Sequence, residues 1–474
     1  FKDMVCYQEE VRDPSRMAEV LNRVIEKAFR GSAPAQINVP RDYWTQVVDI
    51  ELPPIVRFER QGGGKTAIDQ AAKILSEAKF PVILSGAGVV IGNAIEDCKK
   101  LAEKLDAPVC NGYQHNDSFP GNHPLAVGPL GYNGSKAAME LIAKADVVLA
   151  LGTRLNPFST LPGYGIDYWP KKATVIQVDM NPDRIGLTKK VTVGICGDAK
   201  MVSQQLLEKL SPTAGDSGRE DRKNLIHQTK SSWLQTLTSL DHEDDDPGTV
   251  WNKEARERDK DRMSPRQAWR AIQAGMPDDV IISSDIGNNC AIGNAYPTFE
   301  KGRKYLAPGL FGPCGYGFPS ILGAKIGCPD TPVIGFAGDG AFGISMNEMS
   351  SCAREDWPAI SMVIFRNYQW GAEKRNSILW FDDNFVGTEL DPELSYSKVA
   401  IACGLKGVTV KTMEETTKAI KQSCEDQKKG ITTFIEVILN QELGEPFRRD
   451  AMKKPVKVAG INKGDMKPQK SLVN

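Results

Sequence analysis

The stretch GDGAFGISMNEMSSCAREDWPAISMVIFRNYQWG, residues 338–371, decides the fold class of this chain. An apolar run at 332–337 leads into it and a second apolar run, 361–365, lies near its end, and both runs predict strands buried in a parallel sheet. Helically spaced apolar residues predict a helix over 345–354, which ends at a Trp-Pro pair because the residue before proline avoids the helical region. This order predicts an α/β protein with doubly wound parallel sheets.

Two polar side chains follow the two predicted strands. Asp339 lies in the glycine turn after the first strand, and Asn367 comes directly after the second. Because the carboxyl ends of parallel strands share one edge of a sheet, we expect these side chains to point at the same place. Carboxylate and amide oxygens suit Mg²⁺, and the Gly338 turn with the helix start offers N–H groups to phosphates. The pattern predicts a magnesium–diphosphate site; a tight turn with a capping Asp339 is the alternative.

The spacing of this acid and amide resembles the signature of thiamine-diphosphate enzymes. In that family the Asp, the Asn and a main-chain carbonyl two residues further on hold Mg²⁺. The resemblance implies Asp339, Asn367 and the carbonyl of Gln369 as the metal ligands here. The family often has Asn-Asn where this chain has Arg366-Asn367, but the ligand position is kept.

Composition describes an ordinary globular protein. The 474 residues are enough for about three domains, and the net charge of −1 indicates no attraction to nucleic acid or membrane. No apolar run is long enough to span a membrane, and no signal peptide is evident. Ten scattered cysteines and four histidines make a zinc site unexpected, and free thiols fit a reducing cytoplasm. We therefore expect a cytoplasmic protein, and its abrupt start at Phe1 suggests a fragment.

A second glycine turn follows the predicted strand near residue 84. Its pattern, Gly86-x-Gly88-x-x-x-Gly92, invites a dinucleotide-binding interpretation. The spacing misses the usual fingerprint by one residue, and no acidic strand end follows about twenty residues later. We therefore favour a packing turn, with a bound dinucleotide as the alternative.

Over nearly its whole length the chain resembles the acetohydroxyacid synthase-like thiamine-diphosphate enzymes, a multi-domain fold. The resemblance implies an N-terminal pyrimidine-binding domain that is truncated here, so that its first part is missing. It divides the sequence into five segments: a remnant of that domain at 1–55, a central α/β domain at 56–212, a polar linker at 213–262, a diphosphate-binding domain at 263–452 and a basic tail at 453–474.

The same resemblance implies a set of cofactor-binding residues. In the family a bulky apolar side chain props the cofactor where this chain has Cys314, so part of that support would come from a neighbour. The implied contacts to thiamine diphosphate and Mg²⁺ come from four loops: Asp285, Gly287, Asn288, Asn289, Gly312, Cys314, Gly315, Gly338, Asp339, Gly340, Ala341, Asn367, Gln369, Trp370 and Gly371.

Charged residues follow the metal turn where pyruvate-using members of the family carry apolar ones. We expect Arg366, Glu373, Lys374 and Arg375 to recognise anions, with Arg448-Arg449 of the tail as further candidates, because arginine matches tetrahedral oxyanions well. An exposed, charged helix start is the alternative, and for Lys374 alone it is preferred.

Four further segments resemble the family members that act on sulfoacetaldehyde: residues 113–117, 131–136, 367–389 and 441–454. The implied reaction is an acyl transfer in taurine and sulfonate degradation. Sulfoacetaldehyde and phosphate would give acetyl phosphate and sulfite through an intermediate bound to thiamine diphosphate. The alternatives are an acetolactate synthase or 2-oxoacid decarboxylase of the same family, and a non-catalytic, cofactor-free partner subunit.

The resemblance also implies an activating Glu in the pyrimidine-binding domain. No Glu of this chain matches it, so we identify no catalytic residue, with His115 as a candidate, and expect the chain alone to be inactive. The family site lies between two subunits, which implies a homodimer or homotetramer. The expected partners are small-molecule substrates, without nucleic acid or membrane.

Overall fold

The computed structural model describes residues 1–31, 33–54, 59–240, 259–309, 311–380 and 384–442. The chain separates into two compact units, Phe1–Gln61 and Gly62–Asn474. The predicted basic tail at 453–474 and the predicted anion-binding pair Arg448-Arg449 lie outside the described residues. No helix among the described residues is both long and apolar enough to cross a membrane.

The first unit is a small αβ layer. Asp13 accepts a hydrogen bond from the backbone N–H of Ser15 (2.9 Å) and so caps the helical segment that follows it. Val20 and Val24 of that segment pack with Val11 as a small core. Two short strands of this unit pair in parallel. The elements are β1 Tyr7–Glu10, η1 Pro14–Arg16, α1 Met17–Gly31, β2 Ala35–Asn38 and η2 Arg41–Thr45.

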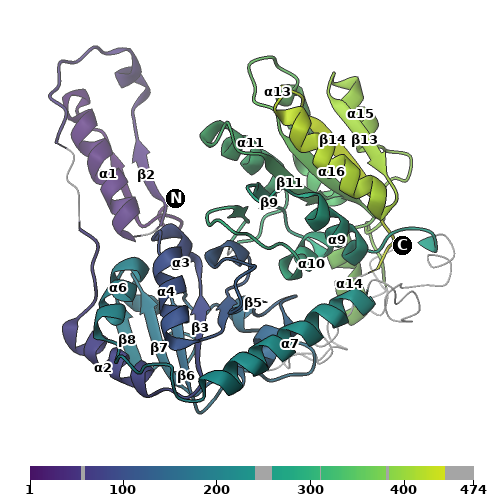
Figure 1. Ribbon diagram of the computed structural model, residues 1–474. Helices are drawn as coiled ribbons and strands as arrows, with labels where there is room; N and C mark the ends of the chain where they lie inside the picture. Colours follow the sequence, from purple (N-terminus) through teal and green to yellow (C-terminus); the bar gives the residue numbers. More distant parts are fainter. Residues whose placement is uncertain (32, 55–58, 241–258, 310, 381–383, 443–474) are drawn as a thin grey trace, which may run out of the picture. The chain divides into compact units, whose positions relative to one another are not determined.

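The second unit begins with a six-stranded parallel sheet in the order β5-β4-β3-β6-β7-β8 (Figure 1). The order reverses beside β3, as in doubly wound folds, so the predicted fold class is confirmed. Helices α2, α4 and α6 pack together, while α5 packs on α7. The strands are β3 Pro81–Ser85, β4 Val109–Asn111, β5 Ala126–Pro129, β6 Val147–Leu151, β7 Thr174–Asp179 and β8 Val193–Cys196. The helices are α2 Lys65–Glu77, α3 Ala87–Ile91, α4 Ile95–Leu105, α5 Lys136–Ile142 and α6 Ala199–Lys209, with η3 Asn116–Ser118, η4 Pro157–Thr160 and η5 Pro182–Arg184.

The glycine turn after β3 is filled by backbone. The N–H of Gly88 donates to the carbonyl of Gly152 (2.8 Å), and a Cβ added at Gly88 would lie 2.7 Å from the Gly152 Cα. A Cβ at Gly86 would lie 2.6 Å from the Gly152 carbonyl oxygen. These glycines are needed because two loops touch backbone to backbone, which supports the packing turn over the dinucleotide site.

Part of the expected polar linker is a long helix, α7 Arg219–Leu240. Its buried Arg222 donates to five backbone carbonyls, among them those of Leu105 (3.0 Å) and Asp106 (2.8 Å) at the end of α4. Ile226 joins the core around the first sheet, and Trp233 joins the core around the second. The helix therefore packs on both cores. Because only a few of its side chains are buried, its polar composition did not indicate a packed helix.

The second sheet is also parallel and six-stranded, in the order β10-β9-β11-β12-β14-β13. Alternate residues of its central strands belong to two different cores, for example Phe336 to one and Ala337 to the other. The sheet is therefore buried on both faces. The strands are β9 Ile281–Ser284, β10 Tyr305–Leu306, β11 Val333–Gly338, β12 Ser361–Arg366, β13 Lys406–Val410 and β14 Thr433–Ile438. The helical segments are α9 Pro265–Gly275, α10 Asn288–Ile292, η6 Gly293–Ala295, α11 Gly317–Gly327, α12 Asp339–Ser345, η7 Met346–Glu348, α13 Met349–Cys352, α14 Gly371–Trp380, α15 Tyr396–Ala402 and α16 Met413–Gln427.

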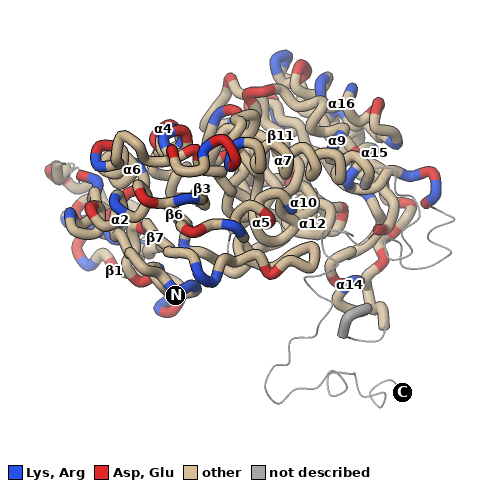
Figure 2. Tube along the Cα trace, turned by 60° about the horizontal axis from the view of Figure 1, so that its bottom comes forward, with Lys and Arg blue, Asp and Glu red and all other residues tan. Residues whose placement is uncertain are grey.

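The helix after the GDG turn differs from its predicted bounds. It begins at Asp339 rather than 345, and it is broken into α12, η7 and α13. Gly340 and Gly343 have low helix propensity, so sequence reasoning placed the start too late. Burial of Ala341 and Phe342 stabilises the early turn instead. Figure 2 shows basic and acidic residues interspersed over surface helices such as α4 and α16, as the net charge of −1 leads one to expect.

Candidate functional site

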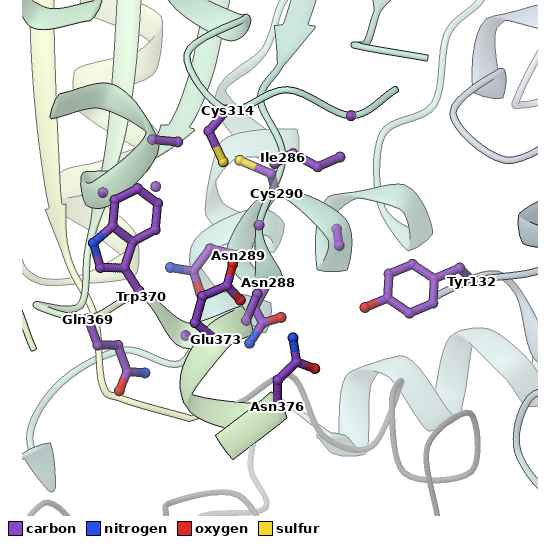
Figure 3. A pocket seen from close by; sticks show the side chains of 18 of the residues that line it. Tyr132, Ile286, Asn288, Asn289, Cys290, Cys314, Gln369, Trp370, Glu373 and Asn376 are labelled. Atoms are coloured by element: carbon purple, nitrogen blue, oxygen red, sulfur yellow. The ribbon is translucent and has the colours of Figure 1, made fainter. Parts of the chain in front are cut away.

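A pocket of about 460 Å³ opens at the carboxyl ends of β9, β11 and β12 (Figure 3). Its lining from the second sheet includes residues of the loops after these three strands, among them Asn288, Gly338 and Asn367. Tyr113, Tyr132, Asn156 and Phe158, from the first sheet's half of the unit, complete the lining. The GDG turn and the strand-end Asn thus share one cavity, as their place at a common sheet edge predicts.

Asp339 is buried at the base of this pocket. Its Oδ2 accepts from Nη1 of Arg366 (3.0 Å) and from the N–H of Tyr368 (2.7 Å), and its Oδ1 accepts from the N–H of Gly340 (3.0 Å). Burial raises the pKa of Asp339 to about 6, while the charge of Arg366 acts in the opposite direction. The carboxyl group is therefore mostly ionised near neutral pH and is fixed in orientation.

Arg366 binds this carboxylate and is not among the residues that line the pocket, so its role in anion binding stays a prediction. It is buried, and its Nη2 donates to the carbonyls of Asp391 and Leu394. Its guanidinium also lies 4.2 Å from the ring centroid of Tyr368. A cation in this position balances the charge of the buried Asp339 carboxylate.

Two buried amide oxygens of the pocket lining accept no hydrogen bond within the described part of the chain: Oε1 of Gln369 and Oδ1 of Asn289. The Gln369 side chain is held by its other atom, because Nε2 donates to the carbonyl of Gln441 (3.1 Å). A Cβ added at Gly338 would meet nothing within 4 Å, so space is open beside the turn. Hard oxygen atoms around an open glycine turn fit a bound Mg²⁺ and diphosphate.

Most of the expected cofactor contacts do line this pocket. They are Gly287, Asn288, Asn289, Gly312, Cys314, Gly338, Asp339, Gly340, Ala341, Asn367, Gln369, Trp370 and Gly371. Figure 3 shows Ile286 and Cys290 beside Cys314, so two neighbours add apolar bulk where the resemblance implies a single large side chain.

Asp285 and Gly315 are not part of the lining. The buried carboxylate of Asp285 accepts from the N–H groups of Ile286 (2.8 Å), Gly315 (3.1 Å) and Gly317 (2.7 Å). It therefore fastens the glycine-rich loop to the end of β9. Neither residue lines the pocket, and their expected contact with the cofactor stays a prediction.

Of the four anion-binding candidates only Glu373 reaches the pocket. Lys374 is buried in an ion pair with Glu389, and Arg375 is buried as well. Residues three apart share a helix face, so α14 presents Glu373 and Asn376 to the pocket and turns the intervening cations away. No Lys or Arg occurs among the described residues that line this cavity.

Sequence reasoning missed the aromatic side of the pocket. The ring centroids of Tyr113, Tyr132 and Phe158 lie 5.8 to 6.0 Å apart, and Figure 3 shows Tyr132 across the cavity from Trp370. The loops that carry both tyrosines contain family-like segments, but nothing in their sequence indicates which residue faces a cavity. The candidate His115 lies outside the lining, and burial, with the nearby charge of Arg154, lowers the pKa of His115 to about 4.

One buried side chain joins these loops to the second sheet's half. Asn294 lies in η6, the 3₁₀ helix that follows α10 directly, and is fully buried. Its Nδ2 donates to the carbonyl of Tyr132 (3.1 Å), and its Oδ1 accepts from the N–H of Gln114 (3.1 Å). Its own carbonyl accepts from Nδ2 of Asn116 (2.9 Å). Asn294 therefore sets the position of the tyrosine loops relative to the wall that carries Asn288 and Asn289.

Comparison with known families assigns both halves of this unit to one class. Residues 68–206 match the model of the thiamine pyrophosphate enzyme central domain, and residues 285–437 match the C-terminal TPP binding domain of the same enzymes. The described pocket lies where these two matched regions meet. The fold and the site thus define a thiamine pyrophosphate enzyme, and thiamine pyrophosphate is another name for thiamine diphosphate.

Individual relatives narrow this class. The probable sulfoacetaldehyde acetyltransferase of Rhizobium meliloti is 77% identical over 472 residues, which are 100% of this chain and 80% of the relative. The sulfoacetaldehyde acetyltransferase of Roseovarius nubinhibens is 72% identical over 99% of this chain and 78% of the relative. The chain therefore belongs to the sulfoacetaldehyde acetyltransferase family of thiamine pyrophosphate enzymes.

A solved structure shows the fold independently. Benzoylformate decarboxylase from Polynucleobacter necessarius matches with a TM-score of 0.70 and 19% identity over 93% of this chain and 76% of that chain. At this identity the match supports the α/β architecture alone. Neither the expected missing N-terminal part nor the expected inactivity of the chain is borne out by the comparisons.

Proposed function

We propose that this protein converts sulfoacetaldehyde and phosphate to acetyl phosphate and sulfite, with thiamine diphosphate and Mg²⁺ as cofactors. The observation that carries the proposal is the pocket containing Asp339 and Asn367, in a chain 77% identical to a probable sulfoacetaldehyde acetyltransferase. The reaction is balanced without an external oxidant. The C–S bond breaks and its electron pair leaves with sulfite, so the methylene carbon is reduced to methyl while the aldehyde carbon is oxidised to the acyl level.

The residues that would hold the cofactor are those at the sheet edge. Asp339, Asn367 and the carbonyl of Gln369 would bind Mg²⁺, and the open turn at Gly338 would admit the diphosphate. When bound, thiamine diphosphate supplies a carbon nucleophile for the aldehyde. Arg366 fixes Asp339 through the hydrogen bond described above, so the metal-binding oxygen is oriented before the metal arrives.

The chain's other residues enclose the substrate. The aromatic rings of Tyr113, Tyr132 and Phe158 form an apolar side of the pocket, which limits access of water to the reacting carbons. Glu373 is the one carboxylate besides Asp339 in the described lining. We propose that it holds or moves a proton at the substrate oxygen, a role for which the pocket offers few other titratable groups.

We further propose a cytoplasmic homodimer or homotetramer. All ten cysteines are free, as expected in a reducing compartment. Phe311 on the pocket rim is 91% exposed and Ile344 is 57% exposed, and large apolar side chains at such positions are typical of subunit interfaces. Sedimentation analysis at micromolar concentration tests this, and a monomer at all concentrations would contradict it.

The test of the function is a product assay combined with cofactor binding. The parent protein with thiamine diphosphate and Mg²⁺ should release sulfite and form acetyl phosphate from sulfoacetaldehyde and phosphate. Acetolactate or carbon dioxide from pyruvate would instead indicate the alternative enzymes. A protein that shows no thermal stabilisation by thiamine diphosphate and Mg²⁺ would be the cofactor-free subunit.

A matched pair of variants tests the metal assignment. Asp339→Asn keeps the shape of the side chain and the acceptor for Tyr368 but removes the charge. The apparent affinity for thiamine diphosphate and Mg²⁺, measured from thermal stabilisation, should fall by at least about 100-fold. Asp330→Asn, on the exposed turn before β11, should leave it unchanged. Equal cofactor binding by both variants would refute the assignment.

A further inference from the structure

The proposed substrate is an anion, yet the described pocket lining holds no cation. Its charged members are Asp339 and Glu373, both acidic. Among the described lining residues, the groups that can bind a sulfonate are therefore neutral hydrogen-bond donors. This inference rests on the proposed function and identifies the residues that select its substrate class.

Asn156 supplies a donor of fixed orientation. It is the N-cap of η4, and its Oδ1 accepts from the N–H of Phe158 (2.6 Å). Because the oxygen is committed to the cap, the remaining group of the amide is Nδ2, which can only donate. Asn156 lines the pocket, and its Nδ2 has no hydrogen-bond partner among the described residues. Pro157 restricts the backbone directly after it, so the donor is held in place.

Asn376 supplies a second donor from the other half of the unit. It lies on α14 one turn after Glu373, and Figure 3 shows its side chain between Asn288 and Tyr132. Its amide is exposed and also makes no hydrogen bond within the described part of the chain. Two amides from separate elements thus line a pocket in which the carboxylate of Glu373 would repel an anion that approached it.

Neutral donors suit this reaction better than a lysine or arginine would. A sulfonate accepts hydrogen bonds through three oxygens. Because the sulfonate is charged, a hydrogen bond from a neutral amide to it is stronger than one between two neutral groups, and no buried ion pair is required. Sulfite, the product, carries more charge than the sulfonate. A fixed cation would hold this product tightly, whereas amides permit its release.

We propose that Asn156 and Asn376 are specificity-determining residues that donate hydrogen bonds to the sulfonate oxygens of the substrate. The decisive variant is Asn156→Asp, which keeps an oxygen to accept from Phe158 and the size of the side chain but replaces the donor with an acidic oxygen. Its matched control is Asn181→Asp. Asn181 also precedes a proline and caps a 3₁₀ helix, accepting from the N–H of Asp183 (2.9 Å), and it does not line the pocket.

The experiment measures kcat and KM for sulfoacetaldehyde with the holoenzyme, and the binding of 2-hydroxyethanesulfonate as an unreactive sulfonate probe. Asn156→Asp should raise KM and weaken probe binding by about 10- to 100-fold, with kcat changed by less than about 3-fold. Asn376→Ala, at an exposed position that the fold tolerates, should raise KM by about 3- to 10-fold. Asn181→Asp should match the parent.

The outcomes separate this inference from the function on which it rests. An active parent whose KM and probe affinity are unchanged in Asn156→Asp and in Asn376→Ala would overturn the inference alone. A parent that releases no sulfite overturns the proposed function. Binding of 2-hydroxyethanesulfonate then decides the inference. If the parent binds this probe and Asn156→Asp does not, the sulfonate site is supported; if the parent does not bind the probe, the inference is overturned as well.

Discussion

The two six-stranded sheets of residues 62–474 each carry a glycine turn at a carboxyl edge, and the surroundings of the two turns differ. After β3, the turn at Gly86 and Gly88 packs directly on the backbone of Gly152. After β11, the turn at Gly338 faces the pocket, and an added Cβ there would meet nothing within 4 Å. One turn closes a protein contact, and the other leaves room for a ligand.

This difference shows that a glycine turn at a sheet edge does not by itself define a binding site. The neighbouring loop decides: beside β3 the loop after β6 enters the space, whereas beside β11 the loop after β12 packs Trp370 on Gly340 and leaves the space at Gly338 open. The acid at Asp339 and the amide on the adjacent strand are therefore the informative signal. Four predictions follow this contrast between a closed and an open edge.

The largest effect is expected from a substitution at Arg222, which packs in the half of the unit that contains the closed turn. Arg222→Ala removes five hydrogen bonds to backbone carbonyls, three of them buried, which should lower the free energy of unfolding by about 3–5 kcal/mol. Lys223→Ala, next along α7 in an exposed pair with Glu220, should cost less than about 0.5 kcal/mol. Urea unfolding of both variants measures this, and similar costs would contradict the role given to Arg222.

The second prediction compares the two turns directly. Gly88→Ala would push a methyl into the Gly152 backbone, which cannot move away easily, and should destabilise the fold by about 2–3 kcal/mol despite alanine's better helix propensity. Gly338→Ala meets no atom, so the apo protein should lose less than about 0.5 kcal/mol.

The readout is thermal unfolding with and without thiamine diphosphate and Mg²⁺. The Gly338→Ala methyl adds bulk at the pocket, so this variant should lose cofactor-induced stabilisation, whereas Gly88→Ala should keep it. If both variants lost stability equally without cofactor, the distinction between closed and open turns would be wrong.

Much of this contrast could be predicted from sequence, because the signals are local. Buried apolar runs gave β11 and β12, and their polar ends, Asp339 and Asn367, meet in the pocket as predicted. The facing of α14 could not be predicted, since apolar periodicity is weak there. Arg375 was expected to recognise anions and Lys374 was preferred as part of an exposed helix start, yet both are buried and neither lines the pocket.

The aromatic side of the pocket needed the tertiary structure. Tyr113 and Asn288 are 175 residues apart in sequence (288 − 113), and their proximity depends on hydrogen bonds such as those of Asn294. No local pattern encodes such a contact. Likewise α7 is stabilised by a few buried side chains, among them Arg222 and Trp233, and the polar residues around them suggested a linker.

The third prediction tests this junction. Asn294→Asp replaces the donor to the Tyr132 carbonyl with an oxygen at a fully buried position, and it should cost about 2 kcal/mol of stability. The tyrosine loops should then shift relative to α10. The factor by which KM for sulfoacetaldehyde rises should therefore exceed the factor by which kcat falls by about 3- to 10-fold. Asn122→Asp, in an exposed loop of the same half, is the control and should behave like the parent. An unchanged KM would separate Asn294 from the pocket.

The smallest effect at neutral pH is expected at His115, which lies near the pocket without lining it. Burial, with the charge of Arg154, lowers the pKa of His115 to about 4, whereas an unfolded chain protonates histidine at about 6.5. The unfolded state therefore binds more protons between these values, and stability falls as the pH falls from about 6.5 toward 4. His115→Gln stays neutral and should not lose stability in this way. Between neutral pH and about pH 5 its free energy of unfolding should fall by on the order of 1–2 kcal/mol less than that of the parent. Denaturant unfolding at about pH 5 and pH 7 measures the difference. Sulfite release at neutral pH should change less than about 2-fold, and a tenfold fall in kcat with stability intact would instead place His115 in the reaction.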